Sequence, residues 1–321
     1  MKSDSIKISV IINCYNGALF VRDALTSALN QTHQNIEIIF WDNRSTDDTA
    51  KIVRSIIDPR IRYFLAETHT NLGEARNLAF EKSTGEWIGY LDVDDLWRPE
   101  KIQKQVEIIL TEKKRNIGLV YTRMEISGGR YSGRELSPYY IGKQLPEGNV
   151  LFELLTVDNF IPLSSAIIRR DAFVQSGKIP HHLKQSEDFH LFAAVAAKFD
   201  VRAVQSIEGT YRVHENNLTN TQQLLACEES IQVIRSHTNF KHDIEKNKLN
   251  RKIESLTVLH ALISLKQRKQ PIRSLKRLVF SNPTVVSNVL SQYFLLRLES
   301  LMASCKLSKR ADIFSQRTRA R

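Results

Sequence analysis

Cysteine is scarce in this sequence of 321 residues: Cys14, Cys227 and Cys305 lie far apart and form no C-x-x-C pair. They supply neither a disulfide framework nor a zinc site, so we expect a reducing, cytoplasmic compartment. Long apolar runs are also missing, since none reaches the roughly 18 residues of a transmembrane helix. The first apolar run comes too early and is too short for a signal peptide, so we expect no secretion.

Glycine-rich phosphate-binding motifs are absent too. The sequence has no G-x-G-x-x-G and no P-loop, which argues against a metal-dependent nucleotidyltransferase. It also contains no internal repeat and no low-complexity tract. The apolar fraction of 42% is nevertheless ordinary for a globular protein, so the chain can build a sizeable core.

Acidic residues are few toward the C-terminal end. Residues 1–225 hold 27 Lys+Arg and 28 Asp+Glu, a net −1, and the remaining 19 basic and 7 acidic residues give 226–321 a net +12, for +11 in all. We therefore predict one α/β domain over 1–222 and a basic, mainly helical extension over 223–321. Apolar positions at helical spacing between Val286 and Leu301 favour helices there.

The basic extension leaves two roles open. It can dock at an anionic membrane surface, where each Lys or Arg contributes on the order of 1 kcal/mol. It can also pack as helices on the first domain or on a partner chain, which would give an oligomer. No recognised nucleic-acid-binding motif is present, so we expect no nucleic acid partner.

Strand-like and helical patterns alternate in the first half. Segments rich in β-branched and aromatic residues lie at 7–12, 36–41, 61–66 and 86–91, and helical patterns lie at 17–30, 47–57 and 73–82. This order predicts a Rossmann-like, mostly parallel sheet with right-handed crossovers. Ligands of such sheets bind outside the carboxyl ends of the strands. We therefore expect a nucleotide at the loops 13–16, 42–48 and 92–97, with contacts from Asn13, Tyr15 and Asn16.

The pattern is less regular after residue 97. We expect a helix from Pro99, a strand over 117–122, a long loop or lid over 124–146, a helix over 147–157, a strand over 164–170, a helix through 184–199, and strand-like segments at 201–205 and 209–214. Pro99 suits the first position of a helix. Trp97, Tyr139 and Tyr140 can each stack on an acceptor sugar, and for Trp97 packing in the core is equally open.

Three aspartates crowd the sequence "LDVDDLW". Unpaired carboxylates at this density raise one another's pKa, and an N-cap role, which suits Asp95, explains only one of them. Asp92 and Asp94 lie two residues apart on extended chain and point to the same side. Because Mg²⁺ and Mn²⁺ commonly take one or two carboxylates plus substrate phosphates, we predict a divalent cation here.

Other polar residues follow the neighbouring segments. Asp42 ends a predicted strand, where a carboxylate can accept the imide N–H of a uracil or hydrogen-bond a ribose. Ser45 or Thr46 suits the N-cap of the next helix. Arg76 falls beside the predicted crevice, where contact with the nucleotide and simple solvation are both open.

The stretches "ISVIINCYNG", "FWDNRSTDDT" and "GEARNLAFEKSTGEWIGYLDVDDLWRP" together resemble the nucleotide-sugar domain of family 2 glycosyltransferases, which adopt the GT-A fold. The likeness is close over 7–101 and looser to about residue 218. It implies that Asp42 binds the base, that Asp92 and Asp94 form the D-x-D pair, and that Asp94 carries the metal. Many members have two aspartates followed by Gly-Ser where this chain has "WDNRS", so the Asn-Arg pair bears on the choice of nucleotide.

The resemblance also implies roles for residues outside the close match. Glu187 and Asp188 would cap a helix on their own, but in similar enzymes this pair lies opposite the metal. Asp188 is then the general base for the acceptor hydroxyl, and Glu187 lies on the acceptor side. An aromatic-Arg-x-His stretch places Arg212 and His214 near the diphosphate or the metal.

The resemblance therefore predicts an inverting, metal-dependent hexosyltransferase with a nucleotide-sugar half at 1–122 and an acceptor half at 123–222. The donor would be a nucleoside diphosphate sugar, with UDP favoured, and the acceptor a saccharide or lipid-linked saccharide. Surface polysaccharide or lipopolysaccharide assembly at the inner face of the membrane is the expected setting. A catalytically inactive sugar-nucleotide binder or scaffold is the alternative, against which the presence of Asp92, Asp94 and Asp188 argues.

Overall fold

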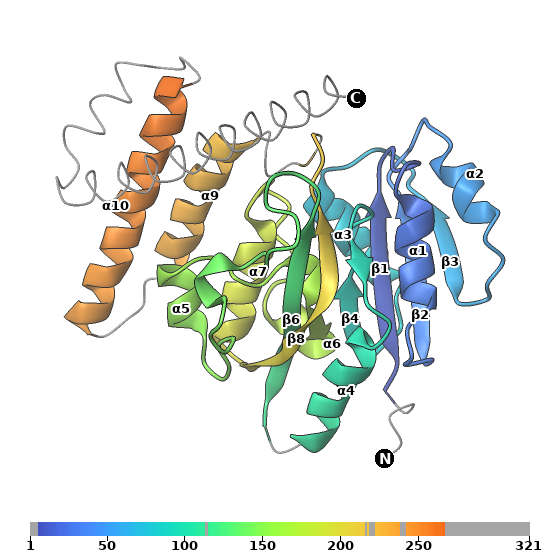
Figure 1. Ribbon diagram of the computed structural model, residues 1–321, viewed down its shortest axis with the longest axis horizontal. Coiled ribbons are helices and arrows are strands. Elements are labelled where there is room, and N and C mark those ends of the chain that lie inside the picture. The colour runs from blue at the N-terminus through green and yellow to red at the C-terminus, as the bar shows by residue number, and fades with distance from the viewer. Residues whose placement is uncertain (1–5, 113–114, 216, 218–221, 238–241, 267–321) are drawn as a thin grey trace, which may run out of the picture. The chain divides into compact units, whose positions relative to one another are not determined.

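The computed structural model describes residues 6–112, 115–215, 217, 222–237 and 242–266 (Figure 1). The chain divides into two compact units, residues 1–241 and residues 242–321. The first unit carries an eight-stranded mixed sheet in the order β3-β2-β1-β4-β7-β6-β8-β5. The described part of the second unit is the helix α10 (Asp243–Lys266).

Parallel strands form one half of the sheet. The elements are β1 (Ile8–Cys14), α1 (Val21–Leu29), β2 (Ile36–Asp42), α2 (Thr49–Arg54), β3 (Ile61–Leu65), α3 (Leu72–Glu81) and β4 (Trp87–Tyr90). β1 pairs in parallel with β2 and β4, and β2 with β3. Cys14 pairs with Asp42, so β1 and β2 end at the same edge of the sheet.

Alternating side chains divide the core between the two faces of these strands. Ile8, Val10 and Ile12 of β1 belong to one apolar cluster together with buried residues of α1, α2 and α4. Side chains alternate along a strand, so Ile11 and Ile39, both fully buried, point to the other face. Helix α3 packs against β1 and β2 there. Helices on both faces leave the carboxyl edge of the sheet as the open side.

Antiparallel pairs join the second half of the sheet to the first. The elements are β5 (Leu96–Trp97), α4 (Lys101–Thr111), β6 (Ile117–Ser127), α5 (Leu151–Thr156), β7 (Ile167–Arg169), α6 (Arg170–Gln175), α7 (Glu187–Ala196), β8 (Asp200–Arg212) and α9 (Gln223–Ser236), with 3-10 turns at Pro138–Tyr140 and Leu163–Ser165. β7 lies antiparallel to β4 and β6, β6 runs parallel to β8, and β8 pairs antiparallel with β5. The two-residue strand β5 thus ties the aspartate loop to β8.

The predicted α/β class with a mostly parallel sheet is confirmed, but several details were wrong. The segments 201–205 and 209–214 belong largely to one strand, β8, whose register against β6 shifts near residues 122–124. Residues 124–127 continue β6 rather than begin the loop. The short elements β5 and α6 were not predicted. Asp95 does not cap α4, whose N-cap position is Glu100.

Helix α9 lies within the first compact unit, whereas the predicted boundary at 222/223 would separate it from that domain. The boundary stays a prediction. None of the described helices is long and apolar enough to cross a membrane. The predicted apolar stripe between Val286 and Leu301 lies outside the described residues.

Candidate functional site

The first two predicted loops are hydrogen-bonded to each other. The Asn16 backbone N–H donates to Ser45 Oγ at 3.0 Å, and its side-chain oxygen accepts from the Thr46 backbone N–H at 2.8 Å. Asn16 has a φ of 56°, a left-handed conformation that asparagine tolerates. Ser45 and Thr46 therefore brace the crevice, and their predicted N-cap role was wrong, because α2 begins only at Thr49.

Asp42 is the buried carboxylate at the end of β2, between these two loops. Its side chain is fully buried, with Oδ1 accepting the Ser45 N–H at 2.7 Å and Oδ2 accepting the Tyr63 hydroxyl at 2.6 Å. Burial, followed by the hydrogen bond to Asp42, raises the pKa of Tyr63 to about 12, so the phenol remains a donor. A carboxylate has roughly four acceptor sites, but the fully buried side chain of Asp42 presents no exposed oxygen to a base in this structure.

The predicted nucleotide contacts Asn13 and Tyr15 differ in exposure. Both amide atoms of Asn13 are buried and have no hydrogen-bond partner among the described residues. The Tyr15 side chain is 52% exposed, and its ring lies 4.4 Å from that of His69 between centroids. His69 was not predicted, since it follows β3 in a loop without any motif. Its Nδ1 lies 2.8 Å from the Asn43 carbonyl oxygen.

Asn43, the departure from the family pattern, makes contacts that an aspartate cannot reproduce. Its Nδ2 donates to the Thr70 carbonyl at 2.8 Å, and its Oδ1 accepts the Thr70 N–H at 3.1 Å. A carboxylate only accepts when ionised, so aspartate would lose the first bond. Asn43 therefore clamps the end of β2 to the loop before α3, while Arg44 at the next position is exposed.

Arg76 joins the aspartate loop to α7. Its guanidinium is 4% exposed and donates from Nη2 to Asp92 Oδ1 at 2.7 Å and from Nη1 to Glu187 Oε1 at 2.6 Å. The other carboxylate oxygen of Glu187, Oε2, is buried with no partner among the described residues. Asp92 and Glu187, which lie 95 residues apart in the sequence, thus share the buried guanidinium of Arg76.

Asp188 follows Glu187 in the first turn of α7. Burial and, next, the charge of Glu187 raise the pKa of its carboxyl, Arg76 opposes both, and the resulting pKa is about 7. A carboxyl with this pKa can accept a proton near neutral pH, which general base catalysis requires. The structure therefore brings a proton acceptor close to the Arg76 bridge.

The third loop gathers Asp94 with residues that follow β8. Asp94 Oδ2 lies 2.9 Å from His214 Nε2 and accepts a 3.3 Å bond from Asn217 Nδ2. Burial raises the pKa of Asp94, the charge of Asp92 adds to this, and His214 opposes it. Asn217 was missed as a site residue, although it stands three positions after the predicted His214.

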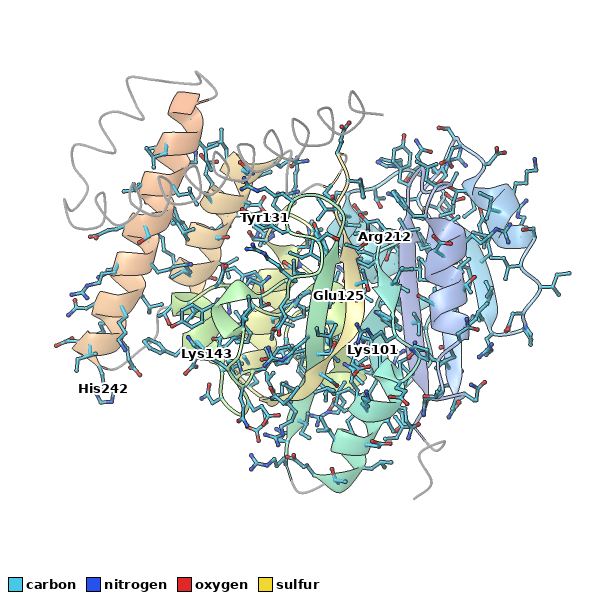
Figure 2. All side chains as sticks on the ribbon, in the orientation of Figure 1. Lys101, Glu125, Tyr131, Lys143, Arg212 and His242 are labelled. Atoms are coloured by element: carbon cyan, nitrogen blue, oxygen red, sulfur yellow. The ribbon has the colours of Figure 1, made fainter. Side chains whose placement is uncertain are left out.

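Arg212 and Asp95 hold this loop in place. Arg212, at the end of β8 in Figure 2, donates from Nε to the Asp94 carbonyl and from Nη1 to Asp23 Oδ2 at 3.0 Å. The Arg212 N–H donates to Asp95 Oδ1 at 3.3 Å. Burial, together with the charges of Asp92 and Asp94, raises the pKa of Asp95 well above its usual range.

The donor set of this loop fits a divalent cation. Within the described ranges no three His, Cys, Asp or Glu side chains form a complete metal site. Asp94 and His214 nevertheless supply one carboxylate and one imidazole that already touch, and crowding among the aspartates favours a positive charge there. Mg²⁺ and Mn²⁺ commonly take their remaining ligands from substrate phosphates and water.

Trp97 occupies a core position. Its side chain is 4% exposed, its indole N–H donates to the Ser164 carbonyl at 2.6 Å, and the Lys101 ammonium lies 4.1 Å above its ring. Of the two possibilities left open by the sequence, the contacts match internal packing. Trp97 therefore presents no exposed ring face on which an acceptor sugar could stack in the way that had been predicted. Tyr140 is likewise buried, whereas Tyr139 is 57% exposed.

Comparison of the sequence with known proteins identifies the family. Residues 9–176 match the model of glycosyl transferase family 2. An uncharacterised glycosyltransferase of Rickettsia typhi is 31% identical over 67% of this chain and 66% of its own length. The UDP-Glc:alpha-D-GlcNAc-diphosphoundecaprenol beta-1,3-glucosyltransferase WfaP of Escherichia coli is 41% identical over 33% of this chain and 42% of its own.

Solved structures agree in fold. TarS 1–349 of S. aureus, in complex with UDP-GlcNAc, superposes with a TM-score of 0.64 at 16% identity, covering 87% of this chain and 83% of that one. The mannosyltransferase PcManGT of Pyrobaculum calidifontis, in complex with GDP-Man and Mn²⁺, superposes with a TM-score of 0.61 at 15% identity, covering 90% and 80%. The two superpositions confirm the predicted GT-A fold. The chain spans 42% to 66% of the length of the first curated relatives that it matches. With a family match across more than half of its residues, the chain belongs to glycosyl transferase family 2.

Proposed function

We propose that the protein transfers a sugar from a nucleoside diphosphate sugar to an acceptor hydroxyl in a single inverting displacement. The observation that carries this proposal is the buried bridge from Asp92 through Arg76 to Glu187. It sets the D-x-D loop, where the diphosphate would lie, across from Asp188, whose pKa of about 7 suits a base. No covalent nucleophile is needed.

The displacement forms one bond and breaks one bond at the anomeric carbon of the donor sugar. The acceptor oxygen forms a bond to the anomeric carbon as its proton passes to a carboxylate oxygen of Asp188. The bond from that carbon to the diphosphate oxygen breaks, and the leaving group takes the electron pair. The transition state resembles an oxocarbenium ion, as in glycoside hydrolysis. Attack from the face opposite the leaving group inverts the anomeric configuration.

Asp94 and His214 would hold a divalent cation, Mn²⁺ or Mg²⁺, which when bound supplies positive charge to the leaving diphosphate. The Arg212 guanidinium already orients this loop through the Asp94 carbonyl. Asn13, Tyr15, Asn16 and Asp42 would hold the nucleotide. Asn13 contributes the amide whose two polar atoms have no partner among the described residues.

The names of relatives support the choice of substrates. WfaP is named for a UDP-glucose donor and a diphosphoundecaprenol-linked acceptor, and TuaG of Bacillus subtilis is named as a putative teichuronic acid biosynthesis glycosyltransferase. We therefore favour a UDP-hexose donor, a saccharide or lipid-linked saccharide acceptor, and a place in surface polysaccharide assembly. The work would be done in the cytoplasm at the inner face of the membrane, with the basic extension over 223–321 contributing membrane or subunit contacts.

Donor hydrolysis tests the function without knowledge of the acceptor. The full-length protein would be incubated with UDP-, GDP- and dTDP-sugars and Mn²⁺, and release of nucleoside diphosphate measured with and without EDTA. We expect slow release from one nucleotide class, abolished by EDTA. A protein that binds a nucleotide, as seen by a rise in Tm, yet releases no diphosphate with any donor would instead be the inactive binder or scaffold.

A further inference from the structure

The loop that leads into α7 is held by a carboxylate from α9, beyond the segment that the family model matches. Glu229 is 6% exposed. Its Oε2 accepts the backbone N–H groups of Lys184 at 3.0 Å, Gln185 at 2.7 Å and Ser186 at 3.0 Å. Its Oε1 shares the Lys184 N–H at 3.0 Å. Three consecutive backbone donors therefore depend on one side chain that is 43 to 45 residues away in sequence.

The N-cap side chain of helix α7 does not cap the helix. Ser186 occupies its N-cap position but makes no capping hydrogen bond. The Ser186 hydroxyl instead lies 3.2 Å from Ser230 Oγ and 3.4 Å from the Ala226 carbonyl, both on α9. The negative charge of Glu229 also suits the positive end of the α7 dipole. All of these restraints on the start of α7 come from a single helix.

Helix α9 is itself well anchored. Its side chains Cys227, Val233 and Ile234 are at most 6% exposed, and α9 packs against α7, beside which it runs in Figure 1. A side chain supported by a packed helix holds its partners more tightly than one on a loop. Glu229 therefore transmits the position of α9 to the backbone just before Glu187 and Asp188.

We propose that Glu229 is a positioning residue that fixes the general base. By holding the backbone of 184–186, it sets Asp188 and Glu187 against the Arg76 bridge and hence against the D-x-D loop. This inference rests on the proposed function, since it assigns a catalytic role to Asp188. Misplacement of a reacting group by about 1 Å can cost on the order of 100-fold in rate, so a small shift of this loop is enough to matter.

The test compares Glu229→Ala and Glu229→Gln in the full-length protein. For Glu229→Ala we expect kcat to fall on the order of 10- to 100-fold, with donor KM and the nucleotide-induced rise in Tm unchanged. Glu229→Gln should lie between Ala and the wild type, because an amide oxygen in place of Oε2 keeps the three acceptor contacts but loses the charge. The matched control is Gln232→Ala, which truncates an exposed side chain of the same helix and should match the wild type.

Amide hydrogen exchange gives a readout that does not need activity. Residues 184–186 should lose protection in Glu229→Ala while the strands β1 and β2 keep theirs. Unchanged kcat despite lost protection at 184–186 would overturn the proposal. A parallel loss of kcat, donor binding and protection across the sheet would also overturn it, since Glu229 would then be only a stabilising residue. If the wild type releases diphosphate from no donor, the proposed function fails, yet the exchange result still decides whether Glu229 holds the loop.

Discussion

Buried carboxylates at the two ends of the parallel strands behave in opposite ways. Glu37, near the start of β2, is 5% exposed and accepts from Ser9 Oγ at 2.7 Å, Thr84 Oγ1 at 2.8 Å and Arg62 Nη1 at 2.9 Å. Burial by itself would raise its pKa, but these donors, led by Ser9, lower it to about 2. The ionised form of Glu37 is thus part of the folded sheet.

In the candidate site, at the carboxyl end of the sheet, burial and neighbouring charges outweigh the hydrogen bonds and the pKa values are raised. Asp94, Asp95 and Asp188 all have raised pKa values, with burial as the largest cause and neighbouring carboxylates as the next. Burial is common to both ends of the sheet, so it does not distinguish the site. The difference lies in the donors. Donors outweigh burial at Glu37, whereas burial and neighbouring carboxylates outweigh the donors at Asp94, Asp95 and Asp188.

The largest effect should come from replacing the base. Asp188→Asn keeps the shape of the side chain but cannot take the acceptor proton, so transfer should fall by roughly 100- to 10,000-fold. Nucleotide binding, followed by the rise in Tm, should stay as in the wild type. The control is Asp171→Asn, which alters an aspartate in the first turn of α6, outside the site. Near-normal transfer by Asp188→Asn with intact donor binding would remove Asp188 from the mechanism.

The next largest effect should be on the free energy of unfolding, after replacement of Glu37 near the start of β2. Glu37→Gln removes a carboxylate whose pKa is about 2 in the folded protein and about 4.3 in an unfolded chain, a loss on the order of 3 kcal/mol at pH 7. Because the folded pKa is depressed, this stability is fully present above the unfolded pKa. It is lost as the pH falls toward 2. Urea unfolding at several pH values measures it.

The pH dependence is what separates the charge of Glu37 from its packing. The variant and the wild type should converge in stability between about pH 4.3 and pH 2. Glu107→Gln, at an exposed position of α4, is the matched control and should change little at any pH. A constant difference across the whole range would mean that Glu37 acts through shape and not through its ionised form.

Local pattern was enough to predict the parallel half of the molecule and the loops of the site. Alternation of strand and helix places Asn13, Asp42 and Asp92 at one edge, because the carboxyl ends of parallel strands meet there. The resemblance added Asp188 and His214, and the structure brings both into the same site as the predicted loops. Their roles stay predictions.

Contacts between distant segments were beyond reach of the sequence. β5 is only two residues long and owes its existence to pairing with β8, as Leu96 does with Thr210. Glu229 reads as an ordinary helical glutamate, and only the packing of α9 on α7 reveals its three backbone partners. The two hydrogen bonds between Asn43 and Thr70 likewise join segments that the local pattern could not place together.

Removal of the predicted cation ligand should separate binding from folding. A nucleotide at 100 times its Kd stabilises a protein by about 2.7 kcal/mol. In Asp94→Asn we expect the part of this gain that depends on Mn²⁺ to vanish, as it does for the wild type in EDTA. Asp48→Asn, at an exposed aspartate before α2, should keep the full effect. A metal-dependent gain that survives in Asp94→Asn would place the cation elsewhere.

The smallest effect tests the contrast between Glu37 and Asp188. Because the pKa of Asp188 is raised, the Asp188→Asn variant should be more stable than the wild type. The carboxyl of Asp188 has a pKa of about 7 when folded and about 3.9 when unfolded, so its ionisation disfavours the folded state. The folded protein should lose stability as the pH rises from about 4 to about 7, and stay level above that. Asp188→Asn has no such loss, so it should be more stable than the wild type above pH 7. Thermal unfolding of both proteins at pH 5 and pH 8 measures the gap. A gap that is the same at both values, or one in favour of the wild type, would mean that Asp188 is satisfied like Glu37 and is not held ready for a proton.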